Sequence, residues 1–272
     1  MIKIRWTGAA GLEFDLGGRT FLVDPYVSRL SKFSILFKAL VSDKSAVQSF
    51  VQDRDGSIAG MVAGHTHFDH ALDLPGILPF CRGPVVGSKS LDTLLACHGT
   101  TPRVTVCQGG ETVALDHDIS VTMILSAHGR VMLGRVPYPG EINGCTRLPM
   151  KAPGYGLGTM FMPKLVINGT TIIHAGSAGV DLHAVDGHTC DVLFMCVPGW
   201  KRSPDYVTTL PRLVKPKIIV PFHYDDFSRP LGSGPGFPVL PFLDMDGFVR
   251  AVSTSWPKAD VVFLNPNRSL EI

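Results

Sequence analysis

The chain has 272 residues, 45% of them hydrophobic and 18% charged, with a formal net charge of +2 at pH 7. This composition is ordinary for a packed globular protein with a sizeable core. So small a charge gives no global reason to expect nucleic acid, which is bound by faces rich in Lys and Arg. No stretch approaches the ~18 to 20 continuous apolar residues of a membrane span, so we expect no transmembrane segment.

Six cysteines are scattered through the sequence, with no C-x-x-C pair. The chain starts with MIKIRWTGAAGLEF, which lacks a basic segment followed by an apolar run and a cleavage site. We therefore expect reduced, mostly buried thiols and a cytoplasmic protein.

The first segment predicts a β-meander. Between Ile2 and Val23, three short apolar runs are separated by Gly-Ala-Ala-Gly and Gly-Gly, a pattern typical of antiparallel strands joined by tight turns. The run ends at Asp24-Pro25, where proline stops the strand and leaves a carboxylate at its tip.

Residues 28–52 are the least regular part of the sequence. An apolar cluster at 33–41 precedes a helix predicted from Asp43, and four basic residues accompany it: Arg29, Lys32, Lys38 and Lys44. Basic plus apolar composition fits a lid over a hydrophobic pocket or a surface that meets anionic lipid. It also fits a helix buried on its own domain or on a second subunit, as in a homo-oligomer, so lid and interface remain alternatives.

The middle of the chain alternates strands with helices. A buried strand at 58–64 runs directly into the sequence HTHFDH, and a helix is predicted to start there with Asp69 in its first turn. Further segments follow in chain order: strand 83–88, helix 88–99, strands 103–107, 111–116 and 119–128, and a Gly- and Pro-rich loop at 129–158.

The last third repeats this alternation. A hairpin over 158–176 should turn at Asn168-Gly169. It is followed by strands at 190–197, 216–223 and 260–265 and by helices at 203–213 and 244–255. Two halves of this kind indicate two sheets packed together with helices outside. Because no long polar linker separates them, we predict one α/β domain over 1–272, with 28–52 as a lid or interface insertion.

The stretch HTHFDH places four metal-ligand side chains on one loop: His65, His67, Asp69 and His70. Imidazole with carboxylate is the ligand mixture that suits zinc and similar divalent ions. A single histidine is usually a structural residue, but four specified residues in six positions predict a metal site. His128 and His223 stand where apolar strands stop and can complete it. Three nitrogens, from His65, His67 and His128, would leave a fourth position for a water whose pKa falls to roughly 7.

The sequence resembles the metallo-β-lactamase superfamily over nearly the whole chain and in the order that the family uses. The matching features are DLGGRTFLVDP, HTHFDH, the strand-end His128, IIHAGSAG and PKIIVPFHY. Within the superfamily it most resembles the branch that contains ascorbate-6-phosphate lactonases and N-acyl phosphatidylethanolamine phospholipase D.

The resemblance implies a fold, an αββα sandwich, and a set of ligands. A first metal would lie on His65, His67 and His128. A second would lie on three further residues: Asp69, His70 and His223. Asp24 would be a carboxylate behind the ligand loop that fixes the orientation of the imidazoles. The expected cofactor is Zn²⁺, as one or two ions, with Mn²⁺ or Fe²⁺ as alternatives.

The pattern breaks at Ser177, where the family has an aspartate that bridges both metals. A neutral hydroxyl removes one negative charge and the bridge, so the second site should be weakened. Three interpretations remain open: one tightly held metal, two metals bridged by hydroxide alone, or a degenerate member that binds metal or ligand without turnover.

The leading interpretation is a metal-dependent hydrolase in which a metal-bound hydroxide cleaves an ester, lactone or phosphodiester bond. Asp69 and His67 are the expected catalytic residues, with Asp69 orienting the nucleophile. The substrate would be a small or lipid-like molecule, docked near Arg130, Arg135 and Tyr224, although a solvated loop also explains the two arginines. A nuclease is the next enzyme class, and the modest charge argues against it.

Overall fold

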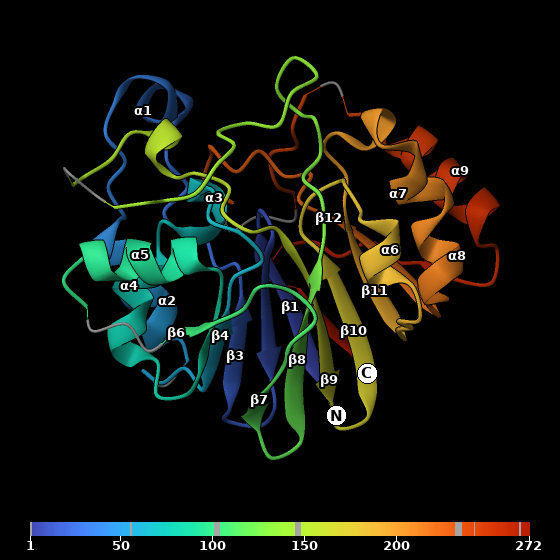
Figure 1. The fold of residues 1–272 in the computed structure, drawn as a ribbon, viewed down its shortest axis with the longest axis horizontal. Coiled ribbons are helices and arrows are strands. Elements are labelled where there is room, and N and C mark those ends of the chain that lie inside the picture. Colours follow the sequence, from blue (N-terminus) through green and yellow to red (C-terminus); the bar gives the residue numbers. More distant parts are fainter. Residues whose placement is uncertain are drawn as a thin grey trace.

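The computed structural model describes residues 2–54, 56–100, 104–144, 148–231, 236–241, 243–266 and 268–272. In this part of the chain two seven-stranded sheets are present. Figure 1 shows the sheets together at the centre of the molecule, with α2, α4 and α5 on one outer side and α6 to α9 on the other. The fold is therefore the four-layer αββα sandwich that the sequence predicted.

The first sheet begins with the predicted meander. Its strands follow the spatial order β14-β1-β2-β3-β4-β5-β6. Pairing is antiparallel from β14 to β3 and parallel from β3 to β6. The bounds are β1 (Lys3–Gly8), β2 (Gly11–Asp15), β3 (Thr20–Val23), β4 (Gly60–Val62), β5 (Val85–Gly87), β6 (Val104–Val106) and β14 (Ser269–Glu271). The sequence did not predict β14, because three residues are too few for a visible alternation.

The second sheet follows the order β13-β12-β11-β10-β9-β8-β7, antiparallel from β7 to β10 and parallel beyond. The predicted hairpin is confirmed: Asn168 and Gly169 have φ of 48° and 83°, as a two-residue turn of this kind requires. The bounds are β7 (Thr112–Asp116), β8 (Ile119–Leu125), β9 (Phe161–Ile167), β10 (Thr170–Ala175), β11 (Val192–Cys196), β12 (Ile218–Phe222) and β13 (Asp260–Val261). β8 thus ends before the predicted boundary at His128.

The helices are short and cover the outer faces of the sheets. The α-helices are α1 (Lys32–Phe37), α2 (Lys44–Gln52), α3 (Phe68–Ala71), α4 (Leu74–Ile77), α5 (Lys89–Cys97), α6 (Leu182–Val185), α7 (Pro204–Thr208), α8 (Leu210–Val214) and α9 (Met245–Ser255). In the described ranges, 3-10 turns cover Leu78–Phe80, Ala152–Gly154 and Trp200–Arg202. The single helix predicted for 203–213 is two helices, because Pro211 cannot donate a backbone hydrogen bond inside a continuous helix. The irregular segment also contains a helix, α1.

The third strand of the first sheet, β3, is buried on both faces. In β3, Phe21 and Val23 belong to the core cluster shared with the second sheet, while Leu22 belongs to the cluster under α2, α4 and α5. Successive side chains of a strand point to opposite faces, so this division follows from the pleat. All three side chains are essentially removed from water, which makes the strand ends rigid points of attachment.

The cysteine prediction holds only in part. Cys107, Cys190 and Cys196 are buried free thiols, as predicted. The prediction is wrong for Cys97, which is disulfide-bonded, because sequence spacing alone does not say which cysteines meet in space. Among the helices of the described residues, none combines the length and the apolar character needed to cross a membrane.

Five strands end at the same edge of the sandwich, and each end is followed by a residue singled out in the sequence. Asp24 follows β3, His65 follows β4, and three residues follow strands of the second sheet: His128 after β8, Ser177 after β10 and His223 after β12. The two sheets therefore bring residues from distant parts of the sequence to one place.

Candidate metal centre

Gly64 carries the chain from β4 into the ligand loop. Its backbone nitrogen donates to Oδ1 of Asp24 at 2.7 Å, and its carbonyl oxygen accepts from the backbone nitrogen of Phe161 in the second sheet at 2.8 Å. A Cβ at this position would lie 3.0 Å from Oδ2 of Asp24. Glycine therefore lets the loop approach the carboxylate closely enough to be held by it.

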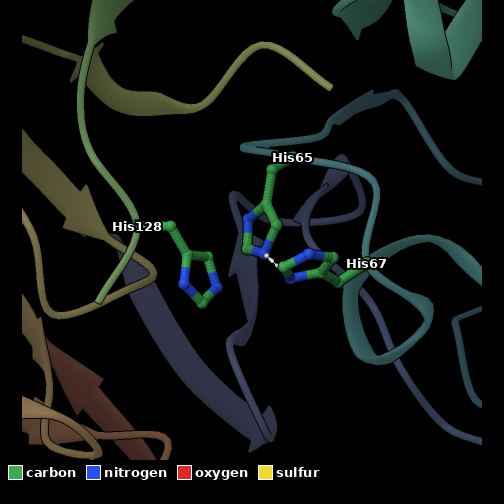
Figure 2. A group of neighbouring side chains, drawn as sticks. All are labelled: His65, His67 and His128. Carbon is green, nitrogen blue, oxygen red and sulfur yellow. Dashed lines mark hydrogen bonds between the residues drawn. The ribbon is translucent and has the colours of Figure 1, made fainter. Parts of the chain in front are cut away.

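The first candidate group consists of His65, His67 and His128, whose ligand nitrogens all lie within 4.8 Å of one another. Figure 2 shows the three rings turned toward one another from two separate loops. Nε2 of His65 lies 3.1 Å from Nδ1 of His67. Nitrogens about 2.0–2.1 Å from one tetrahedral zinc ion lie about 3.4 Å apart. The spacing of the two nitrogens therefore fits a shared ion.

Backbone carbonyl groups orient two of these imidazoles. Nε2 of His67 donates to the carbonyl oxygen of Pro137 at 3.0 Å, and Nδ1 of His128 donates to that of Gly129 at 2.7 Å. A carbonyl oxygen can only accept, so each interaction fixes the proton on that nitrogen. Nδ1 of His67 and Nε2 of His128 keep their lone pairs. These are the atoms that face His65, and a metal needs lone pairs there.

Burial keeps the three histidines neutral. It lowers the pKa of His67 to about 4 and that of His128 to about 3, and it holds the pKa of His65 well below the ordinary value. The neighbouring imidazoles add to the effect, because a second positive charge nearby is unfavourable. Neutral imidazole is the form that binds metal ions, so at pH 7 the group is ready to do so.

A second candidate group consists of Asp69, His70 and His223. Oδ2 of Asp69 lies 3.4 Å from Nε2 of His223 and 3.9 Å from Nε2 of His70. Burial alone would raise the pKa of Asp69, but the charge of His70 and the hydrogen bond from His223 outweigh it and lower the pKa. Asp69 is therefore ionised at neutral pH. His223 has φ of 61°, an uncommon conformation for a residue with a side chain, which is typical of functional sites.

Asp24 lies behind both groups and is fully buried. Its Oδ2 accepts from Nδ1 of His70 at 2.8 Å, while its Oδ1 holds Gly64. It also forms a third close group with His65 and His70. Both of its oxygens already accept hydrogen bonds, so Asp24 is placed to orient the ligand loop.

Ser177 lies at the position where the superfamily resemblance implies a bridging aspartate. Its side chain is buried and lines the same cavity as His128 and His223. Its hydroxyl oxygen accepts a hydrogen bond from the backbone nitrogen of Gly129 at 3.0 Å. The residue therefore supports the backbone beside His128, and it brings no negative charge between the two groups.

His174 is a buried neighbour of Asp24 that the sequence reasoning did not single out. Its Nε2 donates to the carbonyl oxygen of Ala10 at 2.7 Å, and its Nδ1 lies 3.9 Å from Oδ2 of Asp24 without a hydrogen-bond partner among the described residues. Gly176 makes room for it, since a Cβ there would lie 2.7 Å from its ring. The available signal was its place in IIHAGSAG, at the end of a buried strand.

Both groups open into one cavity of about 900 Å³. Its inner wall carries His67, Asp69, His70, His128 and His223. Three cations also line it: Lys32, Lys201 and Arg202. The volume falls in the ~300–1,000 Å³ range of small-molecule sites.

The three expected substrate contacts lie elsewhere. Arg130 is exposed, and Arg135 lines a smaller hollow that shares Met132, Pro137 and Tyr138 with the main cavity. Tyr224 is buried, with its ring 5.0 Å from that of Trp6 and its hydroxyl donating to the carbonyl oxygen of Leu264 at 3.2 Å. None of them is among the described residues that line the cavity. Tyr224 packs inward because its strand end turns that side chain to the core.

Comparison with known proteins finds relatives that are named metal-dependent hydrolases. No family model matches the chain. It is similar to proteins named UPF0173 metal-dependent hydrolase. The relative from Azorhizobium caulinodans is 26% identical over the full length of both chains. The relative from Polynucleobacter asymbioticus is 25% identical over 85% of this chain and 76% of its own.

Solved structures agree in fold. The metallo-β-lactamase fold protein YhfI from Bacillus subtilis superposes with a TM-score of 0.61 at 12% identity over 100% of both chains. The metallo hydrolase Igni18 from Ignicoccus hospitalis gives 0.59 at 13% identity over 99% of this chain and 97% of its own. The diiron β-hydroxylase CmlA from Streptomyces venezuelae gives 0.60 at 14% identity over 100% of this chain and 54% of its own.

The chain thus has the metallo-β-lactamase fold, as its sequence resemblance predicted. Its relatives in sequence are named metal-dependent hydrolases, which supports an enzyme that depends on a metal ion.

Proposed function

We propose that this metal-dependent hydrolase holds one zinc ion tightly on His65, His67 and His128, and that it cleaves an ester, lactone or phosphodiester bond. The observation that carries the proposal is the orientation of two imidazoles by backbone carbonyls. With His67 bonded to Pro137 and His128 to Gly129, the free lone pairs converge beside Nε2 of His65. Buried imidazoles with converging lone pairs and lowered pKa values are a poor arrangement for a purely structural core.

A zinc ion bound there would supply a Lewis acid and lower the pKa of a water molecule to about 7. The chain's own residues supply position and charge. Asp69 faces the cavity as an ionised carboxylate, so it can accept a hydrogen bond from the attacking water and hold it in line with the substrate. Several groups of the inner wall are buried, where the low local dielectric strengthens each electrostatic contact.

The second group supports a weaker metal position. Asp69, His70 and His223 have the right donor atoms, but Ser177 supplies no carboxylate between the groups. Two dications near each other repel strongly unless a shared anion lies between them. We therefore propose one tight site, with the second group orienting the water and filling with metal only when metal is abundant.

Metal content and hydrolysis test the proposal together. The protein, loaded with zinc and dialysed, is analysed for metal and assayed with p-nitrophenyl acetate, a simple lactone and bis-p-nitrophenyl phosphate. We expect about one zinc per chain and measurable hydrolysis of at least one substrate. In His67→Ala both should fall. His117→Ala changes an exposed histidine of the β7–β8 turn and is the matched control, so it should leave both unchanged.

Two outcomes would favour another function, and a third would refute the proposal outright. Zinc bound by the wild type and lost in His67→Ala, with no hydrolysis of any substrate, would indicate a metal- or ligand-binding protein without turnover. No zinc in the wild type at all would refute the proposal. Cleavage of RNA that exceeds cleavage of bis-p-nitrophenyl phosphate and disappears in His67→Ala would assign a nuclease instead.

A further inference from the structure

The outer part of the cavity is apolar on two facing sides. α1 contributes Ile35 and Leu36, and the loop after His128 contributes Val131 and Met132. Leu36 is 65% exposed and Met132 is 49% exposed. Both segments lie at the upper end of the sandwich in Figure 1. Large apolar side chains left in water beside a ligand cavity are typical of a binding surface.

Asp73 fixes the α1 side relative to the candidate ligands. This buried carboxylate accepts from the backbone nitrogens of Val27 at 2.7 Å and Ser28 at 2.8 Å, and from the hydroxyl of Ser42 at 2.5 Å. Both ends of the segment 28–42 are thus tied to one residue, three positions after His70. The apolar side chains of α1 therefore keep a fixed distance from the metal centre.

A second set of contacts ties the same segment to the loop after His223. The guanidinium of Arg29 pairs with the buried carboxylate of Asp225 at 2.5 Å and donates to the carbonyl oxygen of Asp226 at 3.0 Å. Lys32 pairs with the carboxylate of Asp226 at 3.0 Å. These pairs neutralise the cations at the start of α1. Carboxylate partners make the segment a weak surface for anionic lipid, while its apolar side chains stay available.

We propose that the outer cavity binds the apolar chain of the substrate, between α1 on one side and Val131 and Met132 on the other. This inference rests on the proposed function, which places the bond to be cleaved at His65, His67 and His128. Phe227, Leu240 and Leu243 extend the apolar lining. Each methylene that leaves water strengthens binding by about fourfold, so selectivity comes from chain length rather than from charge.

The other face of α1 supplies an internal control. Phe33 and Phe37 are 60% and 63% exposed, and their rings lie 5.3 Å apart. Neither is among the described residues that line the cavity. If α1 instead met a membrane or a second copy of the chain, these two side chains would matter as much as Leu36. Substitutions on the two faces of α1 therefore distinguish an apolar substrate chain from a membrane or a second copy of the protein.

Binding of straight-chain alkylphosphonates to the zinc-loaded protein, measured by calorimetry, tests the inference without turnover. Because the cavity is open on one side, we expect octylphosphonate to bind at least about tenfold more tightly than butylphosphonate. Leu36→Ser with Met132→Ser should reduce that ratio to about threefold or less. Phe37→Ser should leave it unchanged. All three positions are exposed, so thermal unfolding should be near that of the wild type.

Equal affinity for the two phosphonates would overturn the inference, and so would a loss of selectivity in Phe37→Ser as large as in the double variant. A third result would also overturn it. The two phosphonates would bind equally well, and the wild type would sediment with phosphatidylglycerol vesicles while Phe37→Ser would not, so that α1 would bind a membrane instead. Failure of the proposed function would give a different result. His67→Ala would then bind the phosphonates as tightly as the wild type does, while octylphosphonate would still bind more tightly than butylphosphonate.

Discussion

The hydroxyl oxygen of Ser177 accepts a hydrogen bond from the backbone nitrogen of Gly129 at 3.0 Å. Gly129 follows His128 directly, and its carbonyl oxygen orients the imidazole of His128. One small side chain therefore holds the peptide that presents a candidate ligand. In the proposed function, this one residue would both remove a bridging carboxylate and support the first metal position.

Replacing Ser177 with aspartate should raise the metal content toward two ions per chain, because the superfamily resemblance implies a bridging carboxylate at this position. Elemental analysis after loading with zinc and dialysis measures this directly. Ser177→Ala is the control: it should leave the count near one while weakening the affinity, since Gly129 loses its acceptor. An unchanged metal content in Ser177→Asp would show that Ser177 does not limit the second position.

Asp24→Asn should weaken zinc binding by up to about 10–100-fold, the usual range when a group that supports a metal ligand is removed, because Asp24 holds Gly64, which directly precedes His65. The variant keeps the shape of the side chain but loses its negative charge. Its amide has one acceptor oxygen, so it cannot accept from both Gly64 and His70 as the carboxylate does. Competition with a fluorescent chelator gives the affinity. Asp116→Asn changes a carboxylate that pairs with Arg19 and is a suitable control. Equal affinities in the two variants would contradict the role given to Asp24.

The stability of the metal-free protein should depend on pH through its buried histidines. Burial lowers the pKa of His67 to about 4 and that of His128 to about 3, while in the unfolded chain both should titrate near 6.5. As pH falls below about 6.5, the unfolded chain binds more protons than the folded one. The free energy of unfolding therefore decreases with falling pH, and the loss is complete only below the folded pKa values.

His70 acts in the opposite direction: burial alone would lower its pKa, but Asp24 and Asp69 raise it. For this reason the test compares two proteins. Urea unfolding between pH 7.5 and 5 should give a pH slope that is smaller in His128→Gln than in the wild type, by up to about 1.4 kcal/mol per pH unit. Identical slopes would mean that His128 does not remain neutral in the folded state.

Asp73→Ala should lower the free energy of unfolding by about 2–3 kcal/mol, because it leaves several partly buried donors without an acceptor. The same change should release the segment 28–42 and reduce the chain-length selectivity for alkylphosphonates. Asp43→Ala removes the N-cap of α2, whose side chain accepts from Ser45 and Ala46. It should cost about 1 kcal/mol and spare the selectivity. Urea titration gives the free energy of unfolding, and calorimetry gives the chain-length selectivity. A larger loss of either quantity in Asp43→Ala than in Asp73→Ala would contradict the role given to Asp73.

The sequence predicts the strands well because their periodicity is local. Alternation and turn residues indicate the meander and the Asn168-Gly169 hairpin, and each candidate ligand follows an apolar run that becomes a strand. The boundary at His128 is less accurate: the strand ends at Leu125. A strand stops where its partner stops, and that depends on pairing across the sheet rather than on the residues themselves.

The partners of the candidate ligands are much harder to predict. The carbonyl oxygen of Pro137 orients His67 across 70 positions, and that of Ala10 accepts from His174 across 164 positions. Backbone carbonyls exist at every residue, so no sequence pattern distinguishes these two. The two arginines expected to contact the substrate do not line the main cavity for a similar reason: the charge of a loop does not indicate which way the loop faces.

The candidate ligands come from both sheets. His65, His67, Asp69 and His70 follow a strand of the first sheet, while His128 and His223 follow strands of the second. An ion held by this set would act as a cross-link between the two halves of the sandwich. Loss of the ion and separation of the sheets would then be linked events, and the supply of metal would set how long the folded protein lasts.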